Sequence, residues 1–352
     1  TVVPPPPRPN PDLLRRGDPL FFIGSCFSDN VGGRAESSGV GPVLRNPFGV
    51  QYNSASIARC LKRVAAGEEY RPEELGRHPE TGEAFSLDHH SRYNDVDERR
   101  CLERINGDLR RAREFLGGCA QAYVTLGSAF VFDAVGLAGS VATATSPPSD
   151  LSPIRAVANC HKLHPRVFER RLQSADEARD DLLSCVSSLR SLNPNVRVSF
   201  TVSPVRHWKD GPVENGRSKA HLIAACHAAV DAPGSGGRAA ADYFPSYEIV
   251  MDELRDYRFY ERDMLHPSAD ACDYVWERLL DAQFERGDVD PVMGRVEAVR
   301  RAAVHRPFRP ESEKHQAFVM RQLNEADKLE REFPWMDFTE ERRCLKNSSR
   351  PL

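Results

Sequence analysis

The 352-residue sequence lacks the features that mark several large classes of protein. It has no basic excess: 48 Lys and Arg against 51 Asp and Glu give a formal net charge of -3, which argues against a nucleic acid as the main partner. No stretch approaches the ~20 apolar residues of a membrane helix, so we expect no transmembrane segment. GxGxxG, Walker-type and HExxH patterns are also missing, and we expect no metal and no other cofactor.

Cysteine is present, but its spacing matches no known disulfide or zinc-binding pattern. The nine cysteines are scattered along the chain, and no two form a Cys-x-x-Cys motif. This odd, irregular set favours reduced thiols over disulfides or a structural zinc site, and therefore an intracellular compartment such as the cytoplasm or an organelle. The sequence begins at Thr1 without Met, so a removed targeting segment stays open as an alternative.

Short apolar runs alternate with amphipathic segments, and this alternation predicts an α/β fold. We expect buried strands at 19–23, 122–126 and 196–202, and helices at 54–66, 98–116, 168–192, 216–230 and 268–284. Strands alternating with helices imply βαβ units, a parallel sheet and helices on both faces. We expect residues 68–96 to form an irregular insertion, with Asp88-His89-His90 in a surface loop.

Three regions follow from this pattern. Residues 1–17 form a Pro-rich arm that is expected to be extended. Residues 18–286 form the α/β domain. Residues 287–352 carry charged helical segments at 291–304 and 310–332 with no strand between them, and we expect a helical C-terminal extension packed on the domain.

A candidate nucleophile follows the first predicted strand, in Ile23-Gly24-Ser25-Cys26-Phe27-Ser28. In open parallel sheets, ligands bind at the carboxyl ends of the strands. A thiol or hydroxyl at the start of the next helix also faces that helix's positive end, which favours a thiolate or an oxyanion. The ordinary alternative is an unreactive buried Cys beside a capping Ser.

A candidate base stands ahead of the last helix of the α/β region. Asp263 precedes His266 by three residues, so its carboxylate can bind Nδ1 and leave Nε2 as a general base. A local cap or salt bridge is the alternative. Together with Cys26 or Ser25, this pair has the layout of a Ser or Cys hydrolase.

The pentapeptide Gly24–Ser28 resembles the signature of the GSCFA-domain family, which ends in Ala where this chain has Ser28. Other segments that resemble the family are Asn46–Gly49 with Tyr52-Asn53, Leu126–Ala129, Asn159–Lys162, Ser203–Arg206 and Asp263–Pro267. The resemblance covers roughly residues 18 to 340. It implies a place among the SGNH, or GDSL-like, hydrolases, and so a flavodoxin-like three-layer α/β/α fold.

The resemblance also implies catalytic roles. Aligning the SGNH Gly-Asp-Ser turn on Gly24 makes Cys26 the nucleophile, with Ser25 as the fallback. The N–H groups of Cys26 and Gly49 would hold the oxyanion. Ala129 stands where the SGNH hydrolases have an Asn, so either Ser128 or Asn159 supplies the third donor, or the hole has only two.

Five further residues are candidates for substrate binding: Asn46, His161, Arg206, His207 and Lys219. The basic residues among them follow a predicted strand, and fixed positive charges there can bind an anionic group. A solvated polar loop is the alternative.

We therefore expect a hydrolase or acyltransferase that acts on an ester or thioester of a carbohydrate, lipid or other small molecule. A Cys nucleophile also suits thioester exchange or a different chemistry at sulfur. The alternative from another class is a ligand-binding protein on a hydrolase fold, because Ala129 replaces the expected Asn. The acyl group and the oligomeric state stay open.

Overall fold

The computed structural model describes residues 2–4, 13–135, 156–233 and 241–348. Contacts divide the chain into two compact units, which are described separately. Unit 1 comprises Thr1–Pro11, Leu20–Gly32 and Leu44–Val275, and unit 2 comprises Asp12–Pro19, Gly33–Val43 and Trp276–Leu352. Most of the predicted Pro-rich arm lies outside the described residues.

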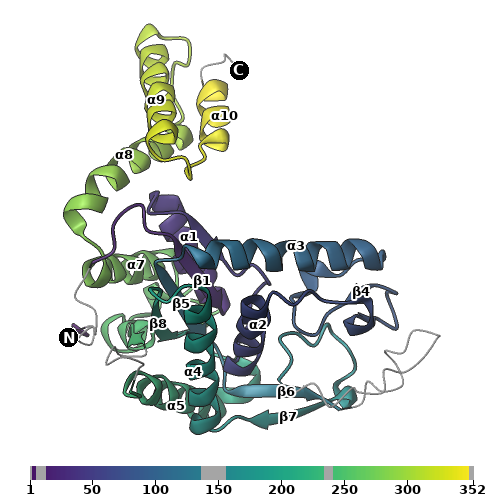
Figure 1. Ribbon diagram of the computed structural model, residues 1–352. Coiled ribbons are helices and arrows are strands. Elements are labelled where there is room, and N and C mark those ends of the chain that lie inside the picture. Colours follow the sequence, from purple (N-terminus) through teal and green to yellow (C-terminus); the bar gives the residue numbers. More distant parts are fainter. Residues whose placement is uncertain (1, 5–12, 136–155, 234–240, 349–352) are drawn as a thin grey trace. The chain divides into compact units, whose positions relative to one another are not determined.

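Unit 1 is built around a five-stranded parallel sheet with the strand order β2-β1-β5-β8-β9 (Figure 1). Its strands are β1 (Leu20–Gly24), β2 (Val43–Arg45), β5 (Gln121–Leu126), β8 (Arg197–Val202) and β9 (Asp242–Tyr243). The register sets Leu20 opposite Gln121, and Gln121 opposite Arg197. The predicted α/β fold and its three buried strands are confirmed. The edge strands β2 and β9 are too short to give an alternating pattern, and the sequence did not predict them.

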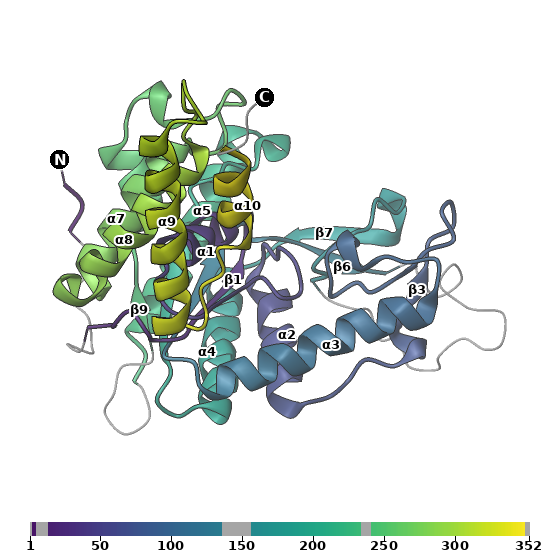
Figure 2. The same ribbon diagram turned by 90° about the horizontal axis from the view of Figure 1, so that it is seen from above.

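Helices cover both faces of this sheet because alternate strand residues point to opposite sides. On one face, Phe21 and Ile23 of β1 belong to the large core formed with α2 (Ser54–Ala66), α4 (Ala175–Leu192) and α5 (Gly211–Val230), which lie side by side (Figure 2). On the other face, Phe22 stacks on Tyr123 at 4.6 Å. Helix α1 (Cys26–Ser38) packs there through Gly32, where a Cβ would lie 3.1 Å from the Phe22 ring.

The single helix predicted at 168–192 is wrong in its first turns. Residues Phe168–Leu172 form strand β7, which pairs antiparallel with β6 (Phe130–Ala134), and α4 begins only at Ala175. Ser174 caps α4: its Oγ accepts from the Glu177 N–H at 3.2 Å, and the Glu177 carboxylate accepts from the Ser174 N–H. This Ser-x-x-Glu capping box is a local start signal within the predicted helix.

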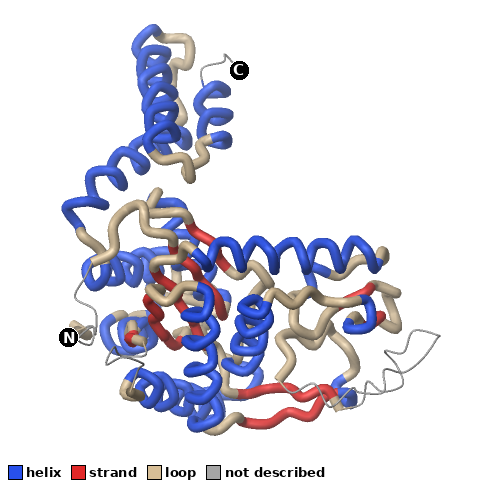
Figure 3. Tube along the Cα trace, viewed as in Figure 1, coloured by secondary structure: helices blue, strands red, loops and turns tan. Residues whose placement is uncertain are grey.

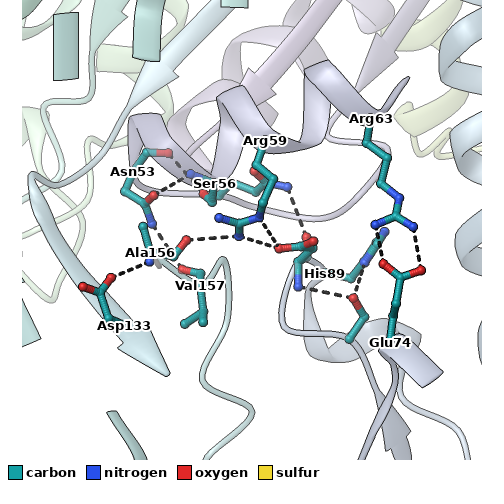
Figure 4. A network of polar contacts seen from close by, with 12 residues as sticks. Asn53, Ser56, Arg59, Arg63, Glu74, His89, Asp133, Ala156 and Val157 are labelled. Atoms are coloured by element: carbon teal, nitrogen blue, oxygen red, sulfur yellow. Dashed lines mark hydrogen bonds and ion pairs between the residues drawn. The ribbon is translucent and has the colours of Figure 1, made fainter. Parts of the chain in front are cut away.

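The insertion at 68–96 contains short 3₁₀ turns and the strand pair β3 (Gly76–Arg77) and β4 (Ala84–Phe85), and α3 (Glu98–Gly117) follows it. The surface loop expected at Asp88-His89-His90 is wrong, because His89 is fully buried. Arg59 of α2 donates to Asp88 at 2.8 Å, and Arg63 binds Glu74 through two hydrogen bonds (Figure 4). Burial alone would raise the pKa of Asp88, but the charge and hydrogen bond of Arg59, together with His89 and Tyr70, lower it. The two ion pairs attach the insertion to α2, and the one with Asp88 is partly buried.

Unit 2 is mainly helical, as predicted (Figure 3). Its helices are α8 (Arg286–Val304), α9 (Glu313–Glu332) and α10 (Thr339–Ser348), and α7 (Ala269–Gln283) begins in unit 1 and ends in unit 2. Val292, Val296 and Val299 of α8 form a core with Ala326 and Leu329 of α9. Helix α10 was not predicted. In the described part of the chain, no helix is both long enough and apolar enough to cross a membrane.

Candidate functional site

The turn that follows β1 is held by backbone contacts from three directions. Gly24 has φ 137°, and a Cβ there would lie 2.0 Å from the Thr125 carbonyl oxygen. The Gly24 N–H donates to Asn46 Oδ1 at 2.8 Å, the Gly24 carbonyl accepts from Gln51, and Ser25 donates to the Thr125 carbonyl. Asn46 was a candidate for substrate binding. Its side chain instead binds the backbone of this turn, with Nδ2 3.4 Å from the Ser25 carbonyl.

Cys26 is the first residue of α1 and is partly exposed. Ser25 beside it is 1% exposed, and its buried Oγ has no hydrogen-bond partner among the described residues. Burial raises the pKa of the Cys26 thiol, and Asp29 acts in the same direction. Hydrogen bonds from the N–H groups of Phe27 and Cys26 and the charge of Lys219 lower it, but they do not outweigh burial. The positive helix end alone therefore does not make this thiol acidic.

Lys219 lies within α5, on the face of this helix that is buried inside unit 1, and not in a polar loop. It is 1% exposed, and Nζ donates to the carbonyl oxygens of Gly127 at 2.7 Å and Ser203 at 2.6 Å. These residues directly follow β5 and β8. Burial lowers the pKa of Lys219 to about 7, and the neighbouring Cys26 opposes that shift. The structure thus brings a buried amine to the sheet edge that carries the candidate nucleophile.

Tyr52 and His207 border the same edge. The Tyr52 carbonyl accepts from the N–H groups of Gly127 at 2.8 Å and Ser128 at 2.9 Å. Burial raises the pKa of the Tyr52 hydroxyl, and the charge of Cys26 raises it further. The Tyr52 and His207 rings meet edge-on, with centroids 5.9 Å apart. Burial lowers the pKa of His207, and Asp210, 3.6 Å from its Nδ1, opposes the shift.

Arg206, another candidate for substrate binding, extends toward the segment around Met251. One guanidinium nitrogen lies 3.5 Å from the Met251 sulfur. Among the described residues Arg206 forms no ion pair with a carboxylate. Its charge is therefore available to an anionic group.

His161 is closed off from a substrate. It is 4% exposed, its ring lies 4.7 Å from that of Phe85, and Nε2 is 2.8 Å from the Ser86 carbonyl oxygen. Burial lowers its pKa to about 4, so the ring is neutral at pH 7. Packing at this position explains His161 without any substrate contact.

Several expected oxyanion donors already have partners. The Gly49 N–H donates to the Asn46 carbonyl at 2.9 Å and closes a tight turn. The Ser128 N–H donates to Tyr52, and Ser128 Oγ accepts from the Phe130 N–H at 3.0 Å. Asn159 Oδ1 accepts from the His161 N–H at 2.7 Å, a bond that uses the amide oxygen and not the Nδ2 donor. The sequence could not show these bonds, because each depends on how a loop closes.

The Asp263–His266 pair has the hydrogen bond that the three-residue spacing predicts. Asp263 Oδ2 lies 2.6 Å from His266 Nδ1, and Oδ1 accepts the N–H groups of Leu265 and His266. These bonds lower the pKa of Asp263 to about 2, and the bond from the His266 N–H has the largest effect. The imidazole is 45% exposed. Its Nε2 has no hydrogen-bond partner among the described residues, and no hydrogen bond joins His266 to Cys26.

The sequence analysis missed two features of this site. Tyr52 was noted only as part of a family segment, and nothing in its local pattern sets it beside Cys26. The burial of Lys219, in contrast, had a signal. It falls on the helical stripe of α5 that also contains Asn215, Leu222 and Cys226, and a Lys on a buried stripe is rare.

Comparison with protein families gives two matches. The model described as GSCFA family matches residues 19–279. The model described as GSCFA domain protein, C-terminal domain, matches residues 296–350. No curated protein matches the chain.

Proposed function

The chain belongs to the GSCFA family, and we propose that it is an SGNH-like hydrolase or acyltransferase that carries an acyl group on Cys26. The observation behind this proposal is the position of a partly exposed thiol at the first residue of α1, directly after β1. The strand order β2-β1-β5-β8-β9 is that of flavodoxin-like sheets. In such sheets ligands bind at the carboxyl ends where the strand order reverses, which here lies between β1 and β5.

The chemistry divides into two acyl transfers. In the first, Cys26 Sγ bonds to the acyl carbon as the thiol proton passes to His266 Nε2. The tetrahedral intermediate then expels an alcohol or thiol, which takes that proton. In the second, water or an acceptor hydroxyl attacks the thioester and restores the thiol. Asp263 orients the imidazole and stabilises its charged form.

Two observations support these roles. Because burial raises the pKa of Cys26, the thiol is mostly protonated at neutral pH and needs a base. The His266 ring is oriented by Asp263, and its Nε2 has no partner among the described residues. The Cys26 N–H is the oxyanion donor that we propose, and Arg206 is the group that we propose to bind an anionic part of the substrate.

Cys26 is favoured over Ser25 as the nucleophile on grounds of access. Ser25 is 1% exposed and follows a turn that Asn46 fixes through the backbone. A hydroxyl so enclosed cannot meet an acyl carbon without opening this turn. If Ser25 is the nucleophile, the reaction class stays the same.

A ligand-binding protein without catalysis is the second candidate. This candidate is favoured because the N–H groups of Gly49 and Ser128 already donate to backbone carbonyls and so do not point at an oxyanion. Losing one oxyanion donor typically costs ~10²–10³ in rate. A site with two such losses would bind a substrate without converting it at a useful rate.

The test is rapid-quench intact mass spectrometry with activated short-chain esters and thioesters, followed by peptide mapping. We expect an acyl mass on Cys26 that accumulates and turns over in the wild type, is absent in Cys26→Ala, and both forms and decays slowly in His266→Ala. Cys160 and Cys344 are the other partly exposed thiols, so Cys160→Ser and Cys344→Ser are matched controls that should still acylate. An adduct on Ser25 would show that Ser25, and not Cys26, is the nucleophile. The absence of an adduct on either residue would favour a ligand-binding protein without catalysis.

A further inference from the structure

Lys219 is a buried amine without a carboxylate partner in the part of the chain that the structure describes. It is 1% exposed and forms no ion pair with a carboxylate among the described residues. An ammonium group has three N–H donors, and Lys219 uses two of them on the carbonyls of Gly127 and Ser203. Because burying an ammonium without a paired charge is costly, its presence here needs another explanation.

The position of Lys219 connects it with the turn that carries Cys26. Gly127 packs against this turn: a Cβ on Gly127 would lie 3.4 Å from Ser25 Cβ. Ser203 in turn donates to the Leu126 carbonyl. One amine therefore binds the first residue beyond each of two adjacent strands, β5 and β8, beside the turn after β1.

Lys219 is the charged side chain that favours a Cys26 thiolate, and it adds to the larger effect of the N–H groups of Phe27 and Cys26. Asp29 from α1 opposes ionisation of the thiol, and the Tyr52 hydroxyl is a weak acid held protonated by burial. His207 is kept neutral by burial and by Lys219 itself. The charge of Lys219 acts in the opposite sense to that of Asp29 on the thiol.

We propose that Lys219 is a positioning residue that fixes the ends of β5 and β8 beside the Cys26 turn and stabilises the Cys26 thiolate with its buried charge. The role in acyl transfer rests on the proposed function. The ionisation of Cys26 does not, because it can be measured without any substrate. The thiol proton leaves for His266 or water. Because burial lowers the pKa of Lys219 to about 7, its charge acts on the thiol mainly below that pH.

The test is the pH profile of Cys26 alkylation by iodoacetamide in the full chain, measured by peptide mapping. Only the thiolate reacts, and a pKa increase of one unit slows alkylation about tenfold at any pH below the pKa. We expect Lys219→Gln, which keeps donors for the two carbonyls but no charge, and Lys219→Met to be alkylated more slowly than the wild type below pH 7, where Lys219 is charged, and at nearly the wild-type rate near pH 9. The matched control is Lys62→Gln, on an exposed position of α2, which should match the wild type.

Folding is checked within the same experiment. The cysteines Cys60, Cys185 and Cys226 are at most 2% exposed, so they stay unmodified as long as the variant is folded. If Lys219→Gln protects these three and alkylates Cys26 at the wild-type rate over the whole profile, the inference is wrong. Partial recovery in Lys219→Arg, which restores a charge, would support it.

The outcome is separate from that of the proposed function. A slowed profile in Lys219→Gln with no acyl-enzyme in the wild type would support the thiolate role and refute acyl transfer. An acyl-enzyme that forms equally fast in wild type and Lys219→Gln, with equal alkylation, would support acyl transfer and overturn the role of Lys219.

Discussion

Replacing Lys219 by Met should change the free energy of unfolding by an amount that depends on pH. Burial lowers the pKa of Lys219 from 10.5 to about 7, whereas the unfolded chain keeps the ordinary value. Between these pH values the unfolded state therefore binds more protons than the folded state, and the wild type gains stability as the pH rises. The gain approaches ~1.4 kcal/mol per pH unit. Lys219→Met has no such group and no such gain.

The sign at neutral pH follows from two opposing contributions. At pH 7 and below, the wild type bears the full cost of its buried ammonium, which the variant avoids. The variant loses the hydrogen bonds to Gly127 and Ser203, each worth about 1 kcal/mol. At pH 7 the charge costs ~4 kcal/mol, about twice what the two hydrogen bonds contribute, so Lys219→Met should be the more stable by ~2 kcal/mol. The difference should move in favour of the wild type by ~2 kcal/mol between pH 7 and pH 9.

Urea denaturation of wild type, Lys219→Met and the exposed control Lys62→Met at both pH values measures this shift. Comparing each variant with wild type cancels the titration of all other groups. The difference for Lys62→Met should stay constant, because Lys62 is exposed and this change removes no buried charge. If the difference in the free energy of unfolding between Lys219→Met and the wild type is the same at pH 7 and pH 9, Lys219 carries no buried charge. The physical basis of its effect on the thiolate would then be refuted.

Three further changes test other parts of the structure. Asp88→Asn leaves Arg59 without its charge partner in a largely buried site, and should lower the free energy of unfolding by about 2 kcal/mol in denaturant titrations; no change would contradict the ion-pair role. Gly24→Ala forces a Cβ 2.0 Å from a carbonyl oxygen of β5 at φ 137°, and should cost more than ~3 kcal/mol, seen as a lower Tm or loss of soluble protein. Asp263→Asn removes the charge that orients His266 and should slow decay of the acyl-enzyme by roughly 10²–10⁴-fold in quench experiments; unchanged decay would exclude the pair from that step.

Local patterns in the sequence were sufficient where neighbours along the chain decide the structure. The apolar runs at β1, β5 and β8 predicted the central strands, because a strand buried on both faces needs apolar residues throughout. The spacing of Asp263 and His266 predicted their hydrogen bond, since three residues of a turn bring the two side chains together. The helix predicted at 168–192 failed only where the Ser174 cap interrupts it.

The wider site depends on contacts between distant segments, and the sequence alone did not determine it. Gly49 and Ser128 were candidate oxyanion donors. The Gly49 N–H donates to Asn46 within a local turn, whereas the Ser128 N–H donates to the carbonyl of Tyr52, which only tertiary packing brings near. His89 and His161 are polar residues in polar segments, and their burial follows from contacts with Tyr93 and Phe85. The place of Lys219 beside Cys26 is set by the parallel order of β1, β5 and β8, in which the strand ends meet at one edge. The sequence by itself determined the strand, turn and helix that present Cys26, because those depend on short-range sterics and periodicity. Only the tertiary structure decided which charges and carbonyls surround that thiol, because residues nearly two hundred positions apart become neighbours only when the sheet has formed.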